Sequence, residues 1–224
     1  MVEAYGGAGW GSAVLSSRRD GILAPRRKMR GGASRTLGSA AVTIAFLDVH
    51  YKGPGARAAC VLSESWESES PMQTYTQHIE TVEPYEPGKF FRRELPCLLS
   101  VLRLLPSLPK VIVVDGYVWL SSVRRPGLGA YLYEALGRRA VVVGVAKTAF
   151  GQVEACSAVA RVYRGSSRTP LFVTAVGMEL EVASQHVRQM AGRHRIPEML
   201  RRADRLSRCA TTAGVGARGP VFSR

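Results

Sequence analysis

Three short apolar runs in the middle of the chain, each followed at once by a charged residue, constrain the fold more than any other feature. The runs are Ala41–Leu47 before Asp48, Val111–Val114 before Asp115, and Val141–Ala146 before Lys147. Their nearly continuous, β-branched apolar composition is typical of strands that are buried on both faces of a sheet. Ligand sites in α/β sheets gather beyond the carboxyl ends of the strands, so we expect the three charged side chains to converge.

The segments around these runs predict a mixed sheet flanked by helices. Ala58–Ser63 and Gln73–Glu80 are expected to pair as a hairpin, and Arg161–Tyr163 and Leu171–Thr174 to form shorter strands. Helices are expected at Leu128–Leu136, Glu179–Ala191 and Pro197–Ser207. Hairpins first and βαβ units later indicate an α/β protein with a central mixed sheet.

A further helix is predicted where apolar residues recur at helical spacing. They are Phe91, Leu95, Leu98, Leu99 and Leu102. Pro96 is expected in the first turn of this helix, where a missing N–H costs no hydrogen bond. Glu94 lies on the flank of the apolar stripe, near its sheet-facing edge, so its carboxylate could reach across to the aspartates.

The charge balance favours a polyanionic partner. The 224 residues include 31 Lys and Arg against 17 Asp and Glu, a formal charge of +14, which suits nucleic acid or an anionic membrane surface. No apolar run approaches the roughly 20 residues that span a bilayer, and the N-terminus lacks the apolar block of a secretory signal. We therefore expect a cytoplasmic, monomeric protein that does not enter a membrane.

The chain length and the glycine-rich ends predict one folded domain. Residues 40–207 are expected to form it, between a mobile basic arm at residues 1–39 and a flexible tail at residues 208–224. The four cysteines are far apart and form no CxxC pair, which argues against a zinc knuckle or a redox motif.

The acidic residues predict a metal site. Along the first strand, Ile44, Phe46 and Asp48 share one face, so the Asp48 carboxylate continues an inward row. Three carboxylates in one cleft would repel and raise one another's pKa, whereas Mg²⁺ or Mn²⁺ prefers such an all-oxygen environment. The alternative is that each acid is an ordinary solvated strand end: Asp115-Gly116 is also a common turn dipeptide. Lys147 is then a surface cation, although in a cleft it would complement a phosphate.

Five ordered motifs give these residues a family context. They are Phe46-Leu47-Asp48-Val49-His50-Tyr51, Pro84-Tyr85-Glu86-Pro87-Gly88 followed by Arg93-Glu94, Val114-Asp115-Gly116, Arg125-Pro126-Gly127-Leu128-Gly129, and Gly144-Val145-Ala146-Lys147. In order and spacing the chain resembles endonuclease V over about residues 42–200. The resemblance implies a ribonuclease H-like fold and a DNA-repair nuclease. Such an enzyme hydrolyses the second phosphodiester bond on the 3′ side of a deaminated base, typically that of deoxyinosine.

The resemblance also assigns roles to residues. Asp48, Glu94 and Asp115 would bind Mg²⁺, with Mn²⁺ as a substitute, and Lys147 would contact the reacting phosphate. Tyr85 would be the tip of a wedge that enters the duplex beside the lesion, where unpairing is cheapest. The remaining residues expected to contact DNA are Pro84, Pro87, Gly88, Gly116, Gly127, Gly129 and His194.

One departure from the family pattern and three alternative functions stay open at this stage. After Asp115-Gly116 the family commonly has a histidine-containing stretch, whereas this chain has Tyr117-Val118-Trp119-Leu120-Ser121-Ser122, so the preferred base is left open. The same metal site would also serve an inosine-specific endoribonuclease. A protein of another class, a non-catalytic basic nucleic-acid-binding protein, would not need the three acids. A membrane-surface protein ranks third, because the chain has no clear basic amphipathic helix with an aromatic apolar face.

Overall fold

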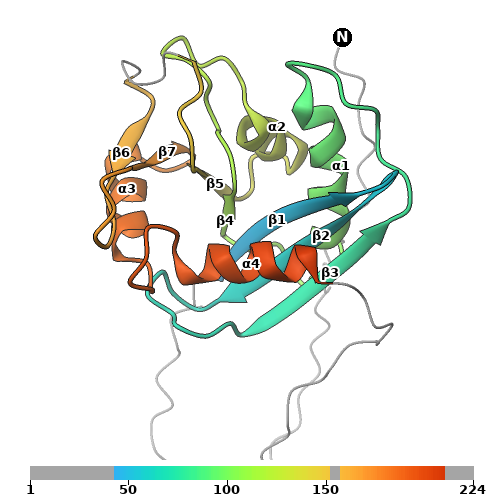
Figure 1. Cartoon of the computed structure of the whole chain (residues 1–224), viewed down its shortest axis with the longest axis horizontal. Coiled ribbons are helices and arrows are strands. Elements are labelled where there is room, and N and C mark those ends of the chain that lie inside the picture. Colours follow the sequence, from blue (N-terminus) through green and yellow to red (C-terminus); the bar gives the residue numbers. More distant parts are fainter. Residues whose placement is uncertain (1–42, 152–156, 210–224) are drawn as a thin grey trace, which may run out of the picture. The chain divides into compact units, whose positions relative to one another are not determined.

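The computed structural model describes residues 43–151 and 157–209, which form a mixed sheet with helices on both faces (Figure 1). The strands are β1 (Ile44–Lys52), β2 (Gly55–Ser63), β3 (Gln73–Ile79), β4 (Val111–Val114), β5 (Val141–Ala146), β6 (Ala160–Val162) and β7 (Leu171–Val176). The helices are α1 (Phe90–Leu102), α2 (Leu128–Ala135), α3 (Leu180–Gln189) and α4 (Glu198–Arg208). Each predicted strand and helix is confirmed, with ends that differ by a few residues.

The strand order is β3-β2-β1-β4-β5-β7-β6. β1, β2 and β3 pair antiparallel as consecutive hairpins, whereas β1, β4 and β5 are parallel neighbours joined through helices. β7 then pairs antiparallel with both β5 and β6. The predicted mixed α/β sheet is thus confirmed, and its parallel centre is the part that can gather side chains at one edge.

Alternation along the central strands supplies two hydrophobic cores. Ala45 and Leu47 of β1 pack with α1 and α2 on one face of the sheet. Ile44 and Phe46 point to the other face, where they pack with α3 and α4. Figure 1 shows α4 crossing in front of β1 and β2 and α1 behind them. Side chains from both layers can therefore reach the edge at which the parallel strands end.

Two local predictions are corrected by the structure. Asp48 is not at the end of a strand, because β1 continues to Lys52 and its last residues pair with β2 in the hairpin. Pro96 lies inside α1 instead of in its first turn. The proline removes the hydrogen bond that residue 96 would give to the Arg92 carbonyl. Burial of Cys97, Leu98, Val101 and Leu102 on one side stabilises the helix despite that loss.

The predicted arm at residues 1–39 lies outside the described residues. So does the predicted tail, except that α4 runs to Arg208 and Cys209 follows it. In the described part of the chain, no helix has the length and apolar character needed to cross a membrane.

Candidate active site

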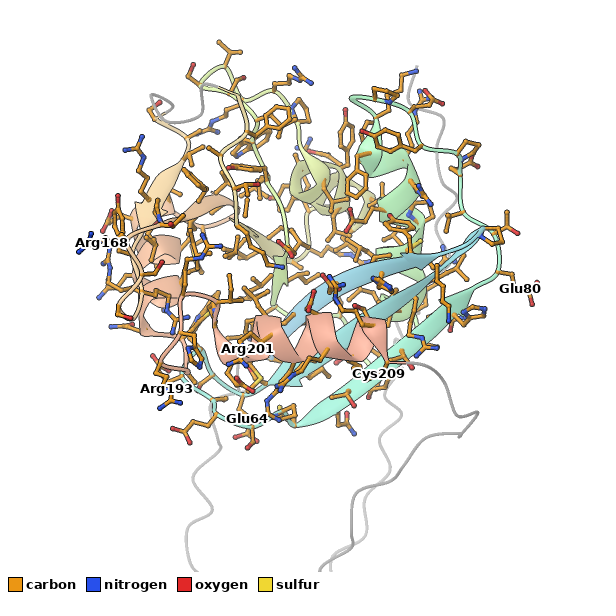
Figure 2. The ribbon with its side chains drawn as sticks, viewed as in Figure 1. Glu64, Glu80, Arg168, Arg193, Arg201 and Cys209 are labelled. Atoms are coloured by element: carbon orange, nitrogen blue, oxygen red, sulfur yellow. The ribbon has the colours of Figure 1, made fainter. Side chains whose placement is uncertain are left out.

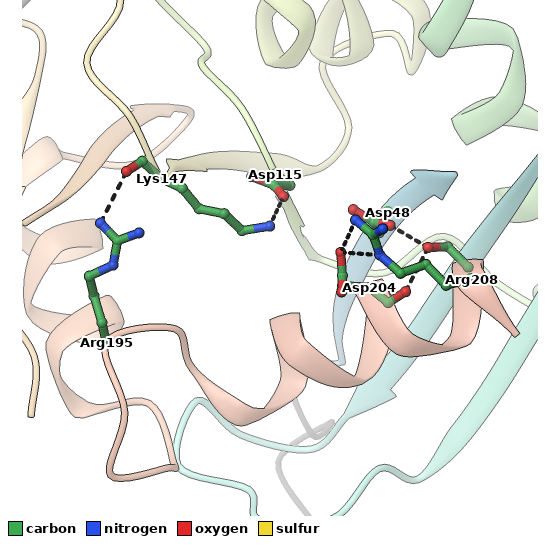
Figure 3. A network of polar contacts seen from close by, with 7 residues as sticks. Asp48, Asp115, Lys147, Arg195, Asp204 and Arg208 are labelled. Carbon is green, nitrogen blue, oxygen red and sulfur yellow. Dashed lines mark hydrogen bonds and ion pairs between the residues drawn. The ribbon is translucent and has the colours of Figure 1, made fainter. Parts of the chain in front are cut away.

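The parallel register brings Asp48, Asp115 and Lys147 to one edge of the sheet. Leu47 of β1 pairs with Val114 of β4, so the residues that follow them, Asp48 and Asp115, occupy the same level on neighbouring strands. Lys147 follows β5, and its Nζ lies 2.5 Å from Oδ2 of Asp115 (Figure 3). The predicted convergence of the three charged residues is therefore present.

Glu94 enters this group from α1, on the face covered by the first core. Only 7% of its surface is exposed. Its Oε2 is buried and has no hydrogen-bond partner. Burial, and then the charges of Asp48 and Asp115, raise the pKa of Glu94 to about 8. A carboxylate left in this condition is costly unless a proton or a cation compensates it.

A fourth acid, Asp204, reaches the same group from α4 on the opposite face, and the sequence analysis did not single it out. Ser207, one turn later, donates a hydrogen bond of 2.5 Å to Oδ2 of Asp48, and its Oγ also lies 2.8 Å from the Asp204 carbonyl oxygen. Nε of Arg208 donates a hydrogen bond of 3.0 Å to Oδ1 of Asp204 (Figure 3). The sequence shows that Asp204 adjoins the apolar face of the predicted helix, at Ala203. It gives no sign that this helix would bring Asp204 opposite Asp48.

Burial and neighbouring charges shift the pKa values of Asp48 and Lys147. Burial raises the pKa of Asp48, the hydrogen bond from Ser207 opposes that rise, and Asp115 and Asp204 add to it. Burial alone would lower the pKa of Lys147, but its hydrogen bond to Asp115 and the nearby acids raise it overall. The lysine therefore stays positively charged beside the acids, where it can attract a phosphate.

The donor set fits a hard divalent cation, although the side chains are not already arranged around one. Among the described residues, no group of three His, Cys, Asp or Glu side chains is close enough to hold a metal ion as it stands. Instead, Lys147 forms an ion pair with Asp115, and Ser207 donates a hydrogen bond to Asp48. The unpartnered oxygen of Glu94 and the all-oxygen chemistry of the acids are what Mg²⁺ or Mn²⁺ would satisfy.

The predicted wedge is an exposed loop that leads into α1. Tyr85 is 61% exposed at its centre, and Pro84, Pro87 and Gly88 are exposed around it. Glu86 forms an ion pair of 2.7 Å with Lys89, and the Lys89 backbone N–H closes the turn by donating to the Glu86 carbonyl oxygen at 3.0 Å. The loop therefore presents an aromatic ring to solvent, as a wedge requires.

Three of the glycines expected to contact DNA differ in how closely their neighbours pack around them. A Cβ on Gly127 would lie 2.5 Å from the Tyr117 carbonyl oxygen, and one on Gly129 would lie 2.7 Å from Cγ2 of Val118. Close packing beneath the loop therefore accounts for both glycines. Next to Asp115, a Cβ on Gly116 would meet nothing within 4 Å, so this glycine leaves open space beside the acids.

His194 is separate from the contacts described for the acids. It is exposed in the loop that joins α3 to α4, next to Arg193 (Figure 2), and its backbone packs against Gly165. The acid that this part of the chain brings to the site is Asp204. The contact of His194 with DNA stays a prediction.

Two supporting contacts were not predicted. Arg195 donates hydrogen bonds to the carbonyl oxygens of Lys147 and Pro170, at 3.1 and 3.2 Å (Figure 3 shows the first). Behind Asp115, the backbone N–H of Val118 donates to Oγ1 of the buried Thr174 at 2.8 Å. Both contacts hold backbone next to a charged residue of the site, and neither has a local sequence signature.

The chain has a ribonuclease H-like fold. Its mixed sheet has this strand order, and the acids come from adjacent parallel strands and from helices on both faces. The endonuclease V of Streptomyces avermitilis superposes with a TM-score of 0.57 at 26% identity, over 74% of this chain and 79% of that one. Ciona intestinalis endonuclease V, in complex with a 24mer DNA containing an inosine followed by a ribo-adenosine, gives 0.60 at 22% identity, over 74% and 84%.

Sequence comparison identifies the family. The Endonuclease V family model matches residues 32–205. The endonuclease V of Xanthomonas campestris pv. campestris is 34% identical over 143 residues, which is 62% of this chain but only 57% of that relative. The chain belongs to the endonuclease V family.

Proposed function

We propose that the protein is a metal-dependent endonuclease of DNA repair. Its substrate is DNA that contains a deaminated base, and it hydrolyses the second phosphodiester bond on the 3′ side of deoxyinosine. The observation that supports this most directly is the group formed by Asp48, Glu94, Asp115 and Asp204, in which Glu94 keeps a buried, unpartnered oxygen near the charges of Asp48 and Asp115. Family membership and the DNA-bound Ciona relative support the choice of substrate.

The four acids would hold Mg²⁺, or Mn²⁺ in its place. When bound, such ions supply an activated water and charge stabilisation for the leaving 3′ oxygen. The water oxygen forms a bond to phosphorus as the bond to the 3′ oxygen breaks, which leaves a 3′ hydroxyl and a 5′ phosphate. No covalent bond to the protein is needed.

Lys147 would position the reacting phosphate. Its ammonium group already lies against Asp115, and the fields of Asp204 and Asp48 help to keep it protonated. Arg195 holds the Lys147 backbone to the turn before β7. A phosphate oxygen that replaces Asp115 as the partner of Nζ would be held at the level of the acids.

Tyr85 and Gly116 would select the damaged base. The exposed ring of Tyr85 would fill the space that the base leaves in the duplex, at a lesion where unpairing is least costly. The open space at Gly116 would receive the displaced base beside Asp115. Pro84, Pro87 and Gly88 lie on either side of Tyr85 in the same loop and would complete the wedge.

The test is to incubate the protein with Mg²⁺ or Mn²⁺ and matched DNA and RNA strands that carry one inosine, and to map the cut. We expect the DNA to be cut at the second phosphodiester bond on the 3′ side of the inosine. We expect no cleavage in EDTA. Cleavage of RNA alone would replace the substrate with inosine-containing RNA. Cleavage of neither strand in either metal would refute the enzyme reading.

A further inference from the structure

A pocket of about 360 Å³ lies immediately beside Lys147, outside the group of acids. It is bordered by the residues that follow β5, by the edge strand β6 and by the turn into β7. The side chains that matter here are Lys147, Thr148, Arg161, Tyr163, Thr169 and Phe172. This volume is within the range of small-ligand sites, roughly 300–1,000 Å³.

Strand register explains why these side chains share one face. Arg161 of β6 pairs directly with Phe172 of β7. Tyr163 follows two residues after Arg161 and so points to the same side, whereas Val162 between them is buried in the core of the opposite face. Phe172 is buried against Tyr117 and Ala146 and forms a packed floor.

The lining chemistry suits a nucleotide of a phosphodiester strand. No acidic side chain is among the described residues that line the pocket, whereas Lys147 and Arg161 contribute cationic groups. Tyr163 leaves 54% of its surface exposed, so a ring face is available at the pocket wall. Strand-binding proteins combine cations that follow the backbone with aromatic rings on which bases stack.

The two walls of the pocket are fixed to each other and to the acids. Arg195 joins the carbonyl oxygens of Lys147 and Pro170, two residues that line the pocket, and the Tyr117 hydroxyl donates to the Thr148 carbonyl at 2.7 Å. Lys147 also contacts Asp115. A strand whose reacting phosphate lies at Lys147 would therefore find the pocket already formed for its next nucleotide, which lowers the cost of ordering.

We infer that this pocket is a subsite for the nucleotide adjoining the reacting phosphate, with its base on Tyr163 and its phosphate near Arg161 and Lys147. This inference rests on the proposed nuclease function. It extends that function from the lesion and the scissile bond to a second contact on the same strand. Because stacking is tolerant of sequence, the subsite would accept any of the bases.

The test measures binding of the full chain to single-stranded DNA in EDTA, by fluorescence anisotropy, so that cleavage does not interfere. One strand carries a deoxyinosine and the other does not, and both are shortened one nucleotide at a time from each end. We expect removal of one particular nucleotide to weaken wild-type binding roughly five-fold or more. The end at which this happens gives the direction of the strand.

Variants connect that loss to the pocket. Tyr163→Ala should bind the longest strand roughly five-fold more weakly and lose no further affinity at the critical truncation, whereas Tyr163→Phe should behave as wild type. Arg161→Ala should weaken binding more than Arg103→Ala, a control that removes an exposed arginine at the end of α1. Equal losses in wild type and Tyr163→Ala at every length would overturn the subsite.

Failure of the proposed function would look different. In that case inosine and plain strands would bind alike and neither would be cut in Mg²⁺. The coupling between Tyr163 and strand length would still decide the subsite on the plain strand.

Discussion

Replacing Glu94 by Gln in the metal-free protein tests whether the centre of the site is as buried and unsatisfied as the structure indicates. The pKa of Glu94 is raised from its ordinary 4.5 to about 8, with burial as the largest cause. Below pH 4.5 the carboxyl is protonated in both the folded and the unfolded chain. As the pH rises from 4.5 to 8, the unfolded chain ionises and the folded one does not, so stability falls over this window.

The size of the effect follows from the pKa shift. One pKa unit corresponds to about 1.36 kcal/mol, so at pH 7 the protonation of Glu94 in the fold costs about 3 kcal/mol relative to acid solution. Gln has nearly the same shape and no ionisable group, so Glu94→Gln does not have this dependence. The free energy of unfolding of the variant, minus that of wild type, should therefore grow by about 3 kcal/mol between pH 4.5 and pH 7.

The assay is urea unfolding in EDTA at several pH values, followed by tryptophan fluorescence. The Gln amide can shift the free energy of unfolding by a constant amount at all pH values. The informative quantity is therefore how the difference between variant and wild type changes with pH. Glu134→Gln on α2 is the control for a surface carboxylate, since Glu134 is exposed and its ion pair with Arg138 lies at the surface; its difference should change with pH by much less than that of Glu94→Gln. When EDTA is replaced by Mg²⁺, the difference between Glu94→Gln and wild type should increase less with pH, because the cation stabilises the ionised form of Glu94. A flat difference for Glu94→Gln would refute the buried, uncompensated site.

Three further outcomes are expected. Asp48→Ala should lower the rate of inosine-DNA cleavage about 100-fold or more while DNA affinity in a filter-binding assay stays close to wild type, because metal coordination supplies several kcal/mol of transition-state stabilisation; equal loss of binding and cleavage would contradict this. Tyr85→Ala should lower the ratio of inosine to unmodified DNA binding about ten-fold, measured by competition, since stacking at the vacated position is removed. Gly127→Ala should destabilise the fold by roughly 1–3 kcal/mol in thermal unfolding, because its Cβ would meet the Tyr117 carbonyl oxygen at 2.5 Å; an unchanged Tm would show that the loop relaxes freely.

Local patterns were sufficient for the elements and for part of the site. The apolar runs before Asp48, Asp115 and Lys147 predicted three buried strands, because side-chain periodicity depends only on local backbone geometry. Helical spacing also placed Glu94 on the correct side of α1, where the structure buries it. The order of motifs gave the family, which the family model confirms.

What the sequence determined by itself was therefore which residues are available and which local elements present them. Tertiary structure alone decided that α4 lies against β1, so that Ser207 and Asp48, 159 residues apart, share a hydrogen bond and Asp204 joins the acids. It also kept Pro96 within α1 and joined Arg195 to Lys147. A local pattern specifies which face of a helix is apolar, but the partner of that face depends on how the whole chain packs, and contacts between distant segments have no local signal.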